Sequence, residues 1–114
     1  MANRRLISKT VIYSDEFSDI PAEALKLYLY LILEADDDGF IGHVKQVIKI
    51  ADSDRKTLDF LIQSGLVIEF KSRVCVIVHW LSHNLINRSG YSPTEFLAER
   101  AQVYLDDEKR YSLC

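Results

Sequence analysis

Apolar and polar residues follow one another along this chain with periods that change several times, and each period predicts an element. Between Ala22 and about Ala35 almost every residue is apolar, which is typical of a helix that is covered on more than one side. Pro21 and the acidic residues before it mark the expected start of this helix. Phe40 and Ile41 then predict one short strand.

The middle of the chain predicts two further helices and a β-hairpin. The apolar residues at helical spacing are Val44, Val47 and Ile48 in the first of these helices and Leu58, Leu61 and Ile62 in the second. Ser53 is the expected N-cap of the second helix, and Gly65 is expected to end it. Residues 66–70 and 74–80 have the composition of strands, so they predict a hairpin with a basic turn at 71–73.

The two end segments give weaker patterns. Residues 4–13 mix β-branched and aromatic side chains and predict an extended arm or a short strand. Ser92, Pro93 and Glu95 have the chemistry of a helix start, so a last helix is expected at about 93–105. The charged residues after it are expected to be frayed or to form a short strand.

In chain order, these elements correspond to a winged helix-turn-helix. A chain of 114 residues is long enough for one hydrophobic core and short for two. We therefore predict a single α+β domain that is mainly helical. Its predicted parts are an N-terminal arm (1–20), a winged-helix core (21–80) and a C-terminal helical extension (81–114).

The charge is distributed unevenly along the chain. The formal net charge is −3, but residues 41–94 carry seven Lys or Arg and four Asp or Glu. A mildly basic centre thus lies between acidic flanks, and such a protein can still bind nucleic acid through one face. The chain has no apolar run of 18 residues and no secretory signal, so we expect a cytoplasmic protein.

The segment 34–45, EADDDGFIGHVK, resembles a calcium-binding loop in its first eight residues. A calcium loop needs a bidentate Glu at its twelfth position, where this chain has Lys45. A catalytic pair among Asp36, Asp37 and Asp38 is the other alternative, but no nucleophile, base or ligand set accompanies it. We favour a helix end closed by Gly39 in a left-handed conformation. Carboxylates are unfavourable at that end of a helix unless Lys45 or Lys49 lies near.

Three residue types that often carry chemistry have simpler explanations here. His79 and His83 have the spacing of a metal pair, but no third ligand is evident. We expect Trp80 to anchor the following segment on the core and His83 with Asn84 to supply hydrogen bonds. Cys75 is expected to be a small buried hydrophobe. The sequence therefore predicts no enzyme, no metal and no cofactor.

Basic and polar residues of the helix-turn-helix and hairpin are the candidates for DNA contact. These are Arg55, Lys56 and Gln63 for the major groove, Lys71 and Arg73 for phosphate or the minor groove, and Lys45 and Lys49 for phosphate. Asp54 and Asp59 lie on or beside the same surface and would repel phosphates. The alternative is a solvated helix face that binds no ligand.

The first helix is too apolar to be covered by one side of a small domain. Tyr28, Leu29 and Tyr30 lie on it. Exposed apolar patches of that width are usually covered by a partner. We therefore predict that these residues contact a second copy of the chain in a homodimer or a higher oligomer.

Several short motifs along the chain occur together in one known family. They are Ile7-Ser8-Lys9, Leu27-Tyr28, residues 35–40, Leu58 to Val67, His79-Trp80 with Asn84, Ile86 and Arg88, Ser92-Pro93-Thr94 with Glu99, and residues 110–113. In this order and spacing they resemble the N-terminal domain of phage replisome organisers and of the related bacterial DnaD primosome proteins. The likeness covers most of the chain, although each motif is short and mostly apolar.

The resemblance implies a winged-helix protein that acts in the initiation of DNA replication inside a bacterial host cell. The expected partners are double-stranded origin DNA, a second copy, and the replicative helicase or its loader. The aspartate triplet would then be structural, as we also expect of Trp80, Asn84, Gly39 and Gly65. After Asn84 the family is more basic, whereas this chain has only Arg88 there. In the alternative hypothesis, the domain is a protein–protein oligomerisation scaffold that makes no direct DNA contact.

Overall fold

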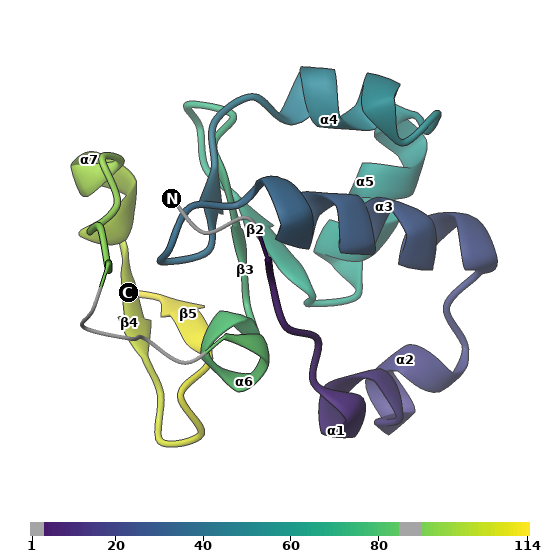
Figure 1. Ribbon diagram of the computed structural model, residues 1–114, viewed down its shortest axis with the longest axis horizontal. Helices are drawn as coiled ribbons and strands as arrows, with labels where there is room; N and C mark the ends of the chain where they lie inside the picture. The colour runs from purple at the N-terminus through teal and green to yellow at the C-terminus, as the bar shows by residue number, and fades with distance from the viewer. Residues whose placement is uncertain (1–3, 85–89) are drawn as a thin grey trace.

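The computed structural model describes residues 4–84 and 90–114 (Figure 1). Its helices are α1 (Lys9–Ile12), α2 (Asp15–Ser18), α3 (Ala22–Glu34), α4 (Val44–Ile50), α5 (Arg55–Gln63), α6 (Trp80–His83) and α7 (Leu97–Arg100). Its strands are β1 (Phe40–Ile41), β2 (Val67–Glu69), β3 (Cys75–Ile77), β4 (Val103–Leu105) and β5 (Tyr111–Leu113). The predicted helices of the middle of the chain, the short strand before them and the hairpin after them are confirmed.

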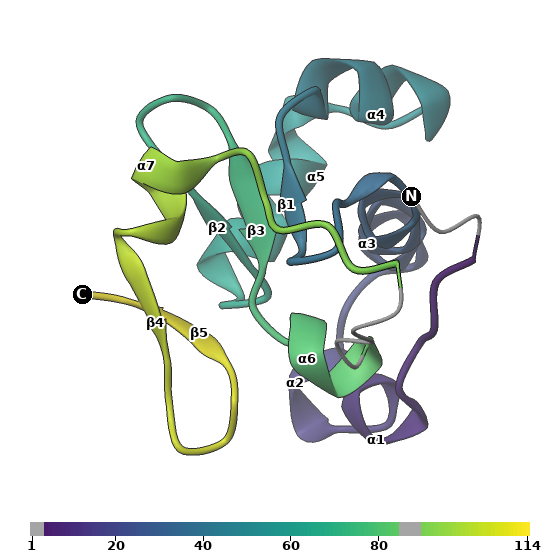
Figure 2. The ribbon, with the colours of Figure 1, turned by 60° about the vertical axis from the view of Figure 1, so that its left-hand side comes forward.

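A three-stranded antiparallel sheet forms the centre of the molecule. Its strand order is β1-β3-β2. The central strand β3 pairs with β1 on one side and with β2 on the other, and β2 and β3 form the predicted hairpin. All three residues of β3 are buried, which explains why residues 74–78 are continuously apolar and do not alternate. The helices α3, α4 and α5 lie on one side of this sheet, and α7 with the β4–β5 hairpin lies on the other (Figures 1 and 2).

The main core lies between α3, α5 and the sheet. Leu27 and Leu31 of α3 and Leu58 and Leu61 of α5 are fully buried, whereas Ile62 is half-buried. Truncating any one of the four buried leucines to Ala is expected to cost about 2–5 kcal/mol. The apolar stripe predicted on the third helix therefore does face the core, and Cys75 is buried in the same core as expected.

The N-terminal segment contains two short helices, so the prediction of an extended arm or a short strand at 4–13 is wrong for residues 9–12. The Ser8 hydroxyl accepts a hydrogen bond from the backbone N–H of Val11 and caps α1. Asp15 and Glu16 occupy the first turn of α2, where negative charge stabilises a helix. Residues 4–8 have no regular structure and remain an arm.

The predicted helix at about 93–105 is also wrong. Only Leu97–Arg100 is helical there, and Val103–Leu105 pairs with Tyr111–Leu113 in a two-stranded antiparallel sheet. The expected capping residues are used elsewhere, because the backbone N–H groups of Ser92 and Thr94 donate to the carboxylates of Asp37 and Asp38. A helix start signal that is bonded to another part of the chain does not start a helix.

Two further details of the turns differ from expectation. The N-cap of α5 is Asp54 rather than Ser53, and its carboxylate accepts from the N–H of Thr57 at 2.8 Å. Gly39 has the expected positive φ of 91°, but α3 has already ended and Gly39 closes the aspartate turn that follows. A Cβ at Gly39 would lie 2.6 Å from Cγ of Trp80, so the close packing of Trp80 also requires glycine.

Together these elements make a compact α+β domain with small antiparallel sheets. Within residues 4–84 and 90–114, no helix is both long enough and apolar enough to cross a bilayer.

Candidate nucleic-acid interface

A groove of about 830 Å³ lies between α4, the start of α5 and the turn end of the β2–β3 hairpin. It is lined by Gly42, His43, Val44, Lys45, Gln46, Ile48, Lys49, Arg55, Glu69 and Arg73. We call it the cationic groove, because four of these residues are Lys or Arg and one is Glu. The sequence-predicted candidates Lys45, Lys49, Arg55 and Arg73, which are up to 28 positions apart in the sequence, are thus brought together.

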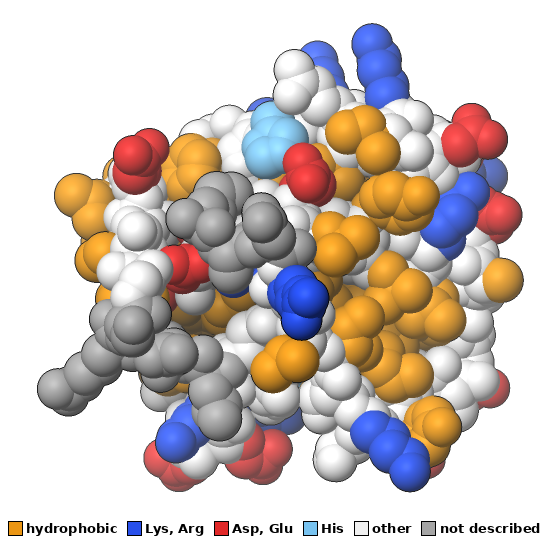
Figure 3. Space-filling view, viewed as in Figure 1, with side chains coloured by type: hydrophobic (Ala, Val, Ile, Leu, Met, Phe, Trp, Pro, Cys, Tyr) orange, Lys and Arg blue, Asp and Glu red, His pale blue; other side chains and the backbone are white. Residues whose placement is uncertain are grey.

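Lys45 and Lys49 supply the least neutralised charge of the groove. Both side chains are on α4 and exposed. In the part of the chain that the structure describes, neither forms an ion pair. Lys and Arg side chains project beyond the molecule at the end where α4 lies (Figure 3). Cations without intramolecular partners, grouped along a concave surface, attract anions strongly.

Arg55 is in a different state, because two carboxylates already hold it. Its terminal nitrogens donate to both oxygens of Glu69 at 2.5 and 2.6 Å, and its Nε donates to Asp59 at 2.9 Å. These bonds raise the pKa of Arg55, and the same bidentate contact lowers the pKa of Glu69. An arginine whose planar fork is occupied cannot read a base with that fork. Arg55 is therefore not available for the predicted base contact, and its bonds fix Asp59 and Glu69 beside it.

The β2–β3 turn brings two more predicted residues to the same end of the molecule. Arg73 has a φ of 74° and lies 3.6 Å from Glu69 through its Nη1. Lys71 is exposed in the same turn, although it does not line the groove. Glu69 therefore faces two arginines at once, and the turn remains positive.

The other two predicted DNA contacts, Lys56 and Gln63, lie on the exposed side of α5 and outside the groove. Phe60 lies on the same helix and is 38% exposed. Asp54 and Asp59 are on this helix as well, so the carboxylates anticipated near the surface are present. The structure therefore divides the predicted residues into a cationic groove and a mixed α5 face.

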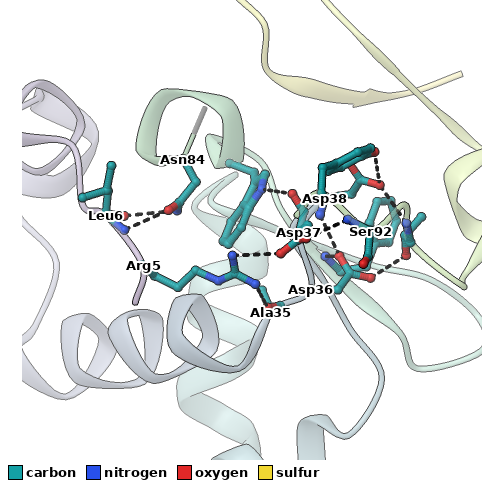
Figure 4. Close-up of polar contacts among 12 residues, drawn as sticks. Arg5, Leu6, Ala35, Asp36, Asp37, Asp38, Asn84 and Ser92 are labelled. Carbon is teal, nitrogen blue, oxygen red and sulfur yellow. Dashed lines mark hydrogen bonds and ion pairs between the residues drawn. The ribbon is translucent and has the colours of Figure 1, made fainter. Parts of the chain in front are cut away.

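The aspartate turn is a structural clamp, which we define as Asp36, Asp37 and Asp38 with the groups they bind (Figure 4). Asp38 is buried and accepts from the Tyr91 hydroxyl at 2.8 and 2.9 Å and from the Thr94 N–H at 2.8 Å. Asp36 accepts from the Thr94 hydroxyl at 2.5 Å and from two backbone N–H groups of its own turn. The clamp thus fastens residues 91–94 to the end of α3.

Burial and hydrogen bonding shift the pKa values of the clamp carboxylates in opposite directions. Burial raises the pKa of Asp36, whereas the hydrogen bond from the Ser92 N–H lowers the pKa of Asp37. Neither Lys45 nor Lys49 forms an ion pair with the triplet in the described part of the chain, and the cation beside it is Arg5, which pairs with Asp37. Among the described residues, no three His, Cys, Asp or Glu side chains are arranged to hold a metal ion.

The opposite side of the clamp holds the N-terminal arm. Arg5 donates to the carbonyl oxygen of Ala35 at 2.8 Å, forms an ion pair with Asp37 at 3.1 Å and lies over the ring of Trp80. Trp80 is fully buried and donates through Nε1 to the carbonyl oxygen of Asp37 at 2.9 Å. The predicted anchoring role of Trp80 is confirmed.

His83 and Asn84 hold the next residues of the arm. The amide of Asn84 exchanges two hydrogen bonds with the backbone of Leu6, at 2.8 and 3.1 Å (Figure 4). His83 accepts from the Ser8 N–H through Nδ1, so its neutral ring carries a hydrogen on Nε2, which donates to the Tyr28 hydroxyl at 2.8 Å. Burial lowers the pKa of His83 to about 4, which keeps the ring neutral. The predicted hydrogen-bonding roles of His83 and Asn84 are confirmed.

The residues predicted for self-association are not equivalent. Tyr28 is fully buried and bonded to His83, so it is not available to a second chain. The prediction that Tyr28 contacts a second copy is therefore wrong. Leu29 and Tyr30 are half-buried. Leu29 and Leu33 lie four positions apart on α3, and Leu33 is 53% exposed; Leu25, four positions before Leu29, is half-buried and also packs against the core. Apolar atoms gather over α3 in the space-filling view (Figure 3).

Several structural residues were missed from the sequence. Arg5, Tyr91, Ser92 and Thr94 hold the clamp, and Glu69 orients Arg55. Of these, only Glu69 had a visible signal, since it is an isolated acid in an apolar strand next to a basic turn. Ile86 and Arg88, which carry part of the family resemblance, lie outside the described residues.

Comparison with known proteins adds no relative: no family model, no curated protein and no solved structure matches this chain.

Proposed function

We propose that this protein is a winged-helix module that binds double-stranded DNA during the initiation of replication. The observation that carries the proposal is the cationic groove, where Lys45, Lys49 and Arg73 lie beside one another at one end of the molecule. The order α3, β1, α4, α5, β2, β3 supports it, because a helix-turn-helix followed by a hairpin is the arrangement of winged-helix DNA-binding domains.

The residues of this surface take different parts in the proposal. Lys45, Lys49 and Arg73 bind phosphate oxygens, with Lys71 beside them at the hairpin turn. Lys56 and Gln63 face the bases from α5. Arg55 contacts no base, because its guanidinium is bound to Glu69, and it serves to shape the wall of the groove. The partners at the origin, the replicative helicase or its loader, follow from the family resemblance alone.

Duplex binding measured at several salt concentrations tests the proposal. The test variant is Lys45→Glu with Lys49→Glu, and the matched control is Lys9→Glu with Lys109→Glu, which changes the net charge equally. Lys9 begins α1 and Lys109 lies in the β4–β5 turn, both at the end of the molecule opposite α4 (Figure 1).

We expect the test variant to lose at least about tenfold in affinity for a fluorescent duplex and the control to lose about twofold. The wild-type slope of log affinity against log salt is expected near about −3, for roughly three neutralised phosphates. The test variant is expected to have a weaker salt dependence, with a slope whose magnitude is smaller by about two. Equal losses in both variants would mean that net charge, and not this groove, governs binding.

The apolar residues Leu29 and Leu33 of α3 support a second candidate function, that of an oligomerisation scaffold. Leu33 is 53% exposed, and the half-buried Leu29 lies four positions before it. In this proposal, two copies bury these residues against each other. Light scattering of Leu29→Arg with Leu33→Glu tests it: we expect the wild type to have at least twice the mass of this variant. A wild type that is monomeric at all concentrations would exclude it.

A further inference from the structure

The floor of the cationic groove is apolar, although its rim is charged. Val44 and Ile48 lie one turn apart on α4, and both line the groove. Gly42 adds backbone without a side chain to the same lining. Lys45 and Lys49 follow the two apolar residues directly in the sequence, so charged and apolar positions alternate around the same helix. The groove therefore combines a concave apolar surface with cations at its edge.

The cations of the groove can meet phosphates, but its apolar floor has no part in such a contact. Phosphates stay hydrated and contact exposed cations, so they gain nothing from a floor of Val44 and Ile48. A protein segment that carries carboxylates and a large apolar side chain matches both parts, because the carboxylates meet the lysines while the apolar side chain leaves water. A volume of about 830 Å³ accommodates a few side chains of such a segment.

We propose that the cationic groove binds an acidic segment of a partner protein, anchored by one or two large apolar side chains on the floor of Val44 and Ile48. The carboxylates of the segment pair with Lys45, Lys49 and Arg73. Arg55 also lines the groove, where Glu69 and Asp59 hold its guanidinium. The proposal stands on the groove itself and does not depend on DNA binding.

One consequence follows if both proposals hold. Lys45 and Lys49 cannot pair with phosphates and with carboxylates at the same time. Binding of the acidic segment and binding of a duplex then exclude each other, and each ligand lowers the affinity for the other by the same factor. The groove would thus exchange DNA for a protein partner.

Fluorescence anisotropy with labelled peptides tests the proposal. The probe is an acidic peptide of Glu residues with two leucines four positions apart. One control peptide has Ser in place of the leucines, and a second has Lys in place of Glu. We expect the leucine peptide to bind at least about tenfold more tightly than the serine peptide, because apolar burial adds to charge. The lysine peptide is not expected to bind.

A groove-filling variant separates this site from a duplex site. Gln46 is exposed and lines the groove, so Gln46→Trp occupies the space without changing the charge. We expect it to weaken the leucine peptide at least about tenfold and to leave duplex affinity within about twofold. If the leucine and serine peptides bind equally, or if Gln46→Trp weakens the duplex and not the peptide, the proposal is overturned.

Amide chemical shifts of the unmodified protein provide a second measurement that does not depend on the folding of a variant. On addition of the leucine peptide, we expect the largest changes at residues 42–49 and at Arg73. The duplex is expected to shift Lys56 and Gln63 as well. Peptide-induced changes confined to α3 or to the β4–β5 hairpin would place the peptide elsewhere and overturn the proposal.

Discussion

The aspartate clamp and the cationic groove are the two most charged regions of the molecule, and they use charge in opposite ways. In the clamp, Asp38 is 7% exposed and its carboxylate is bonded to Tyr91 and Thr94. In the groove, Lys45 and Lys49 are exposed and form no ion pair with any described residue. The clamp has its partners within the chain, whereas the lysines of the groove are open to a partner from outside.

This difference shows that a run of like charge in a sequence does not by itself indicate a binding site. Three consecutive aspartates form a dense run of negative charge, yet their oxygens bind the chain's own N–H and O–H groups. The lysines of the groove are separated in the sequence, and they have no acceptor among residues 4–84 and 90–114. What distinguishes the two regions is whether desolvation is already compensated within the fold.

The largest expected effect concerns the clamp. Replacing Asp38 with Ala leaves the hydroxyl of Tyr91 and the N–H of Thr94 without their acceptor in a buried place. We expect the free energy of unfolding to fall by about 3 kcal/mol, measured by urea denaturation. Asp107→Ala, in an exposed turn, is the control and is expected to change it by less than about 0.5 kcal/mol. Equal losses would remove the distinction between the two regions.

The second effect concerns His83, beside the clamp. Its pKa is about 4 in the folded protein and 6.5 for a solvated histidine, so the unfolded chain binds the proton first as pH falls. Stability is therefore complete above about pH 6.5 and is lost progressively toward pH 4, by at most about 3 kcal/mol. The measurement is the urea midpoint across this pH range for wild type and His83→Gln. Parallel curves for the two proteins would show that His83 does not contribute.

The third effect tests whether charge in the groove can be released. Glu69→Gln removes the carboxylate that holds Arg55 and Arg73. If the groove binds phosphates as proposed, affinity for a duplex at low salt is expected to rise about fivefold, which corresponds to about 1 kcal/mol. Glu108→Gln, in the distant β4–β5 turn, is the charge-matched control. An affinity that falls in Glu69→Gln would mean that the carboxylate itself is needed for binding.

The smallest effect is expected from removing the lysines one at a time. Lys45→Ala and Lys49→Ala are each expected to change the free energy of unfolding by less than about 0.5 kcal/mol, since neither side chain has a partner to lose within the described chain. Thermal or urea unfolding measures this. A loss above about 1 kcal/mol would assign these lysines to the fold and weaken their proposed role in binding.

The parts of the fold that the sequence predicted correctly depend on local patterns. The helices at 22–34, 44–50 and 55–63 and the hairpin after them have strong apolar periods, a proline or glycine at their limits, and short connections. Such signals operate over a few residues, so they can be recognised without knowledge of the rest of the chain.

The errors occurred where contacts between distant residues override local signals. The helix start at Ser92–Glu95 has suitable residues, but Thr94 bonds to Asp36 and Asp38, more than 50 positions earlier. Tyr28 resembles an interface residue in the sequence, but its hydroxyl is bonded to His83, 55 positions later. The same is true of the groove. Its cations could be predicted as a set, whereas the hydrogen bonds between Glu69 and Arg55 could not.

The pinned N-terminal arm has a consequence for how the chain is made. Leu6 and Ser8 bond to Asn84 and His83, which follow them by 78 and 75 positions. A ribosome releases the arm first, yet the groups that hold it emerge only after the sheet has been synthesised. During synthesis, the arm therefore cannot form these bonds until His83 and Asn84 have left the ribosome, so its docking is a post-translational or late co-translational event.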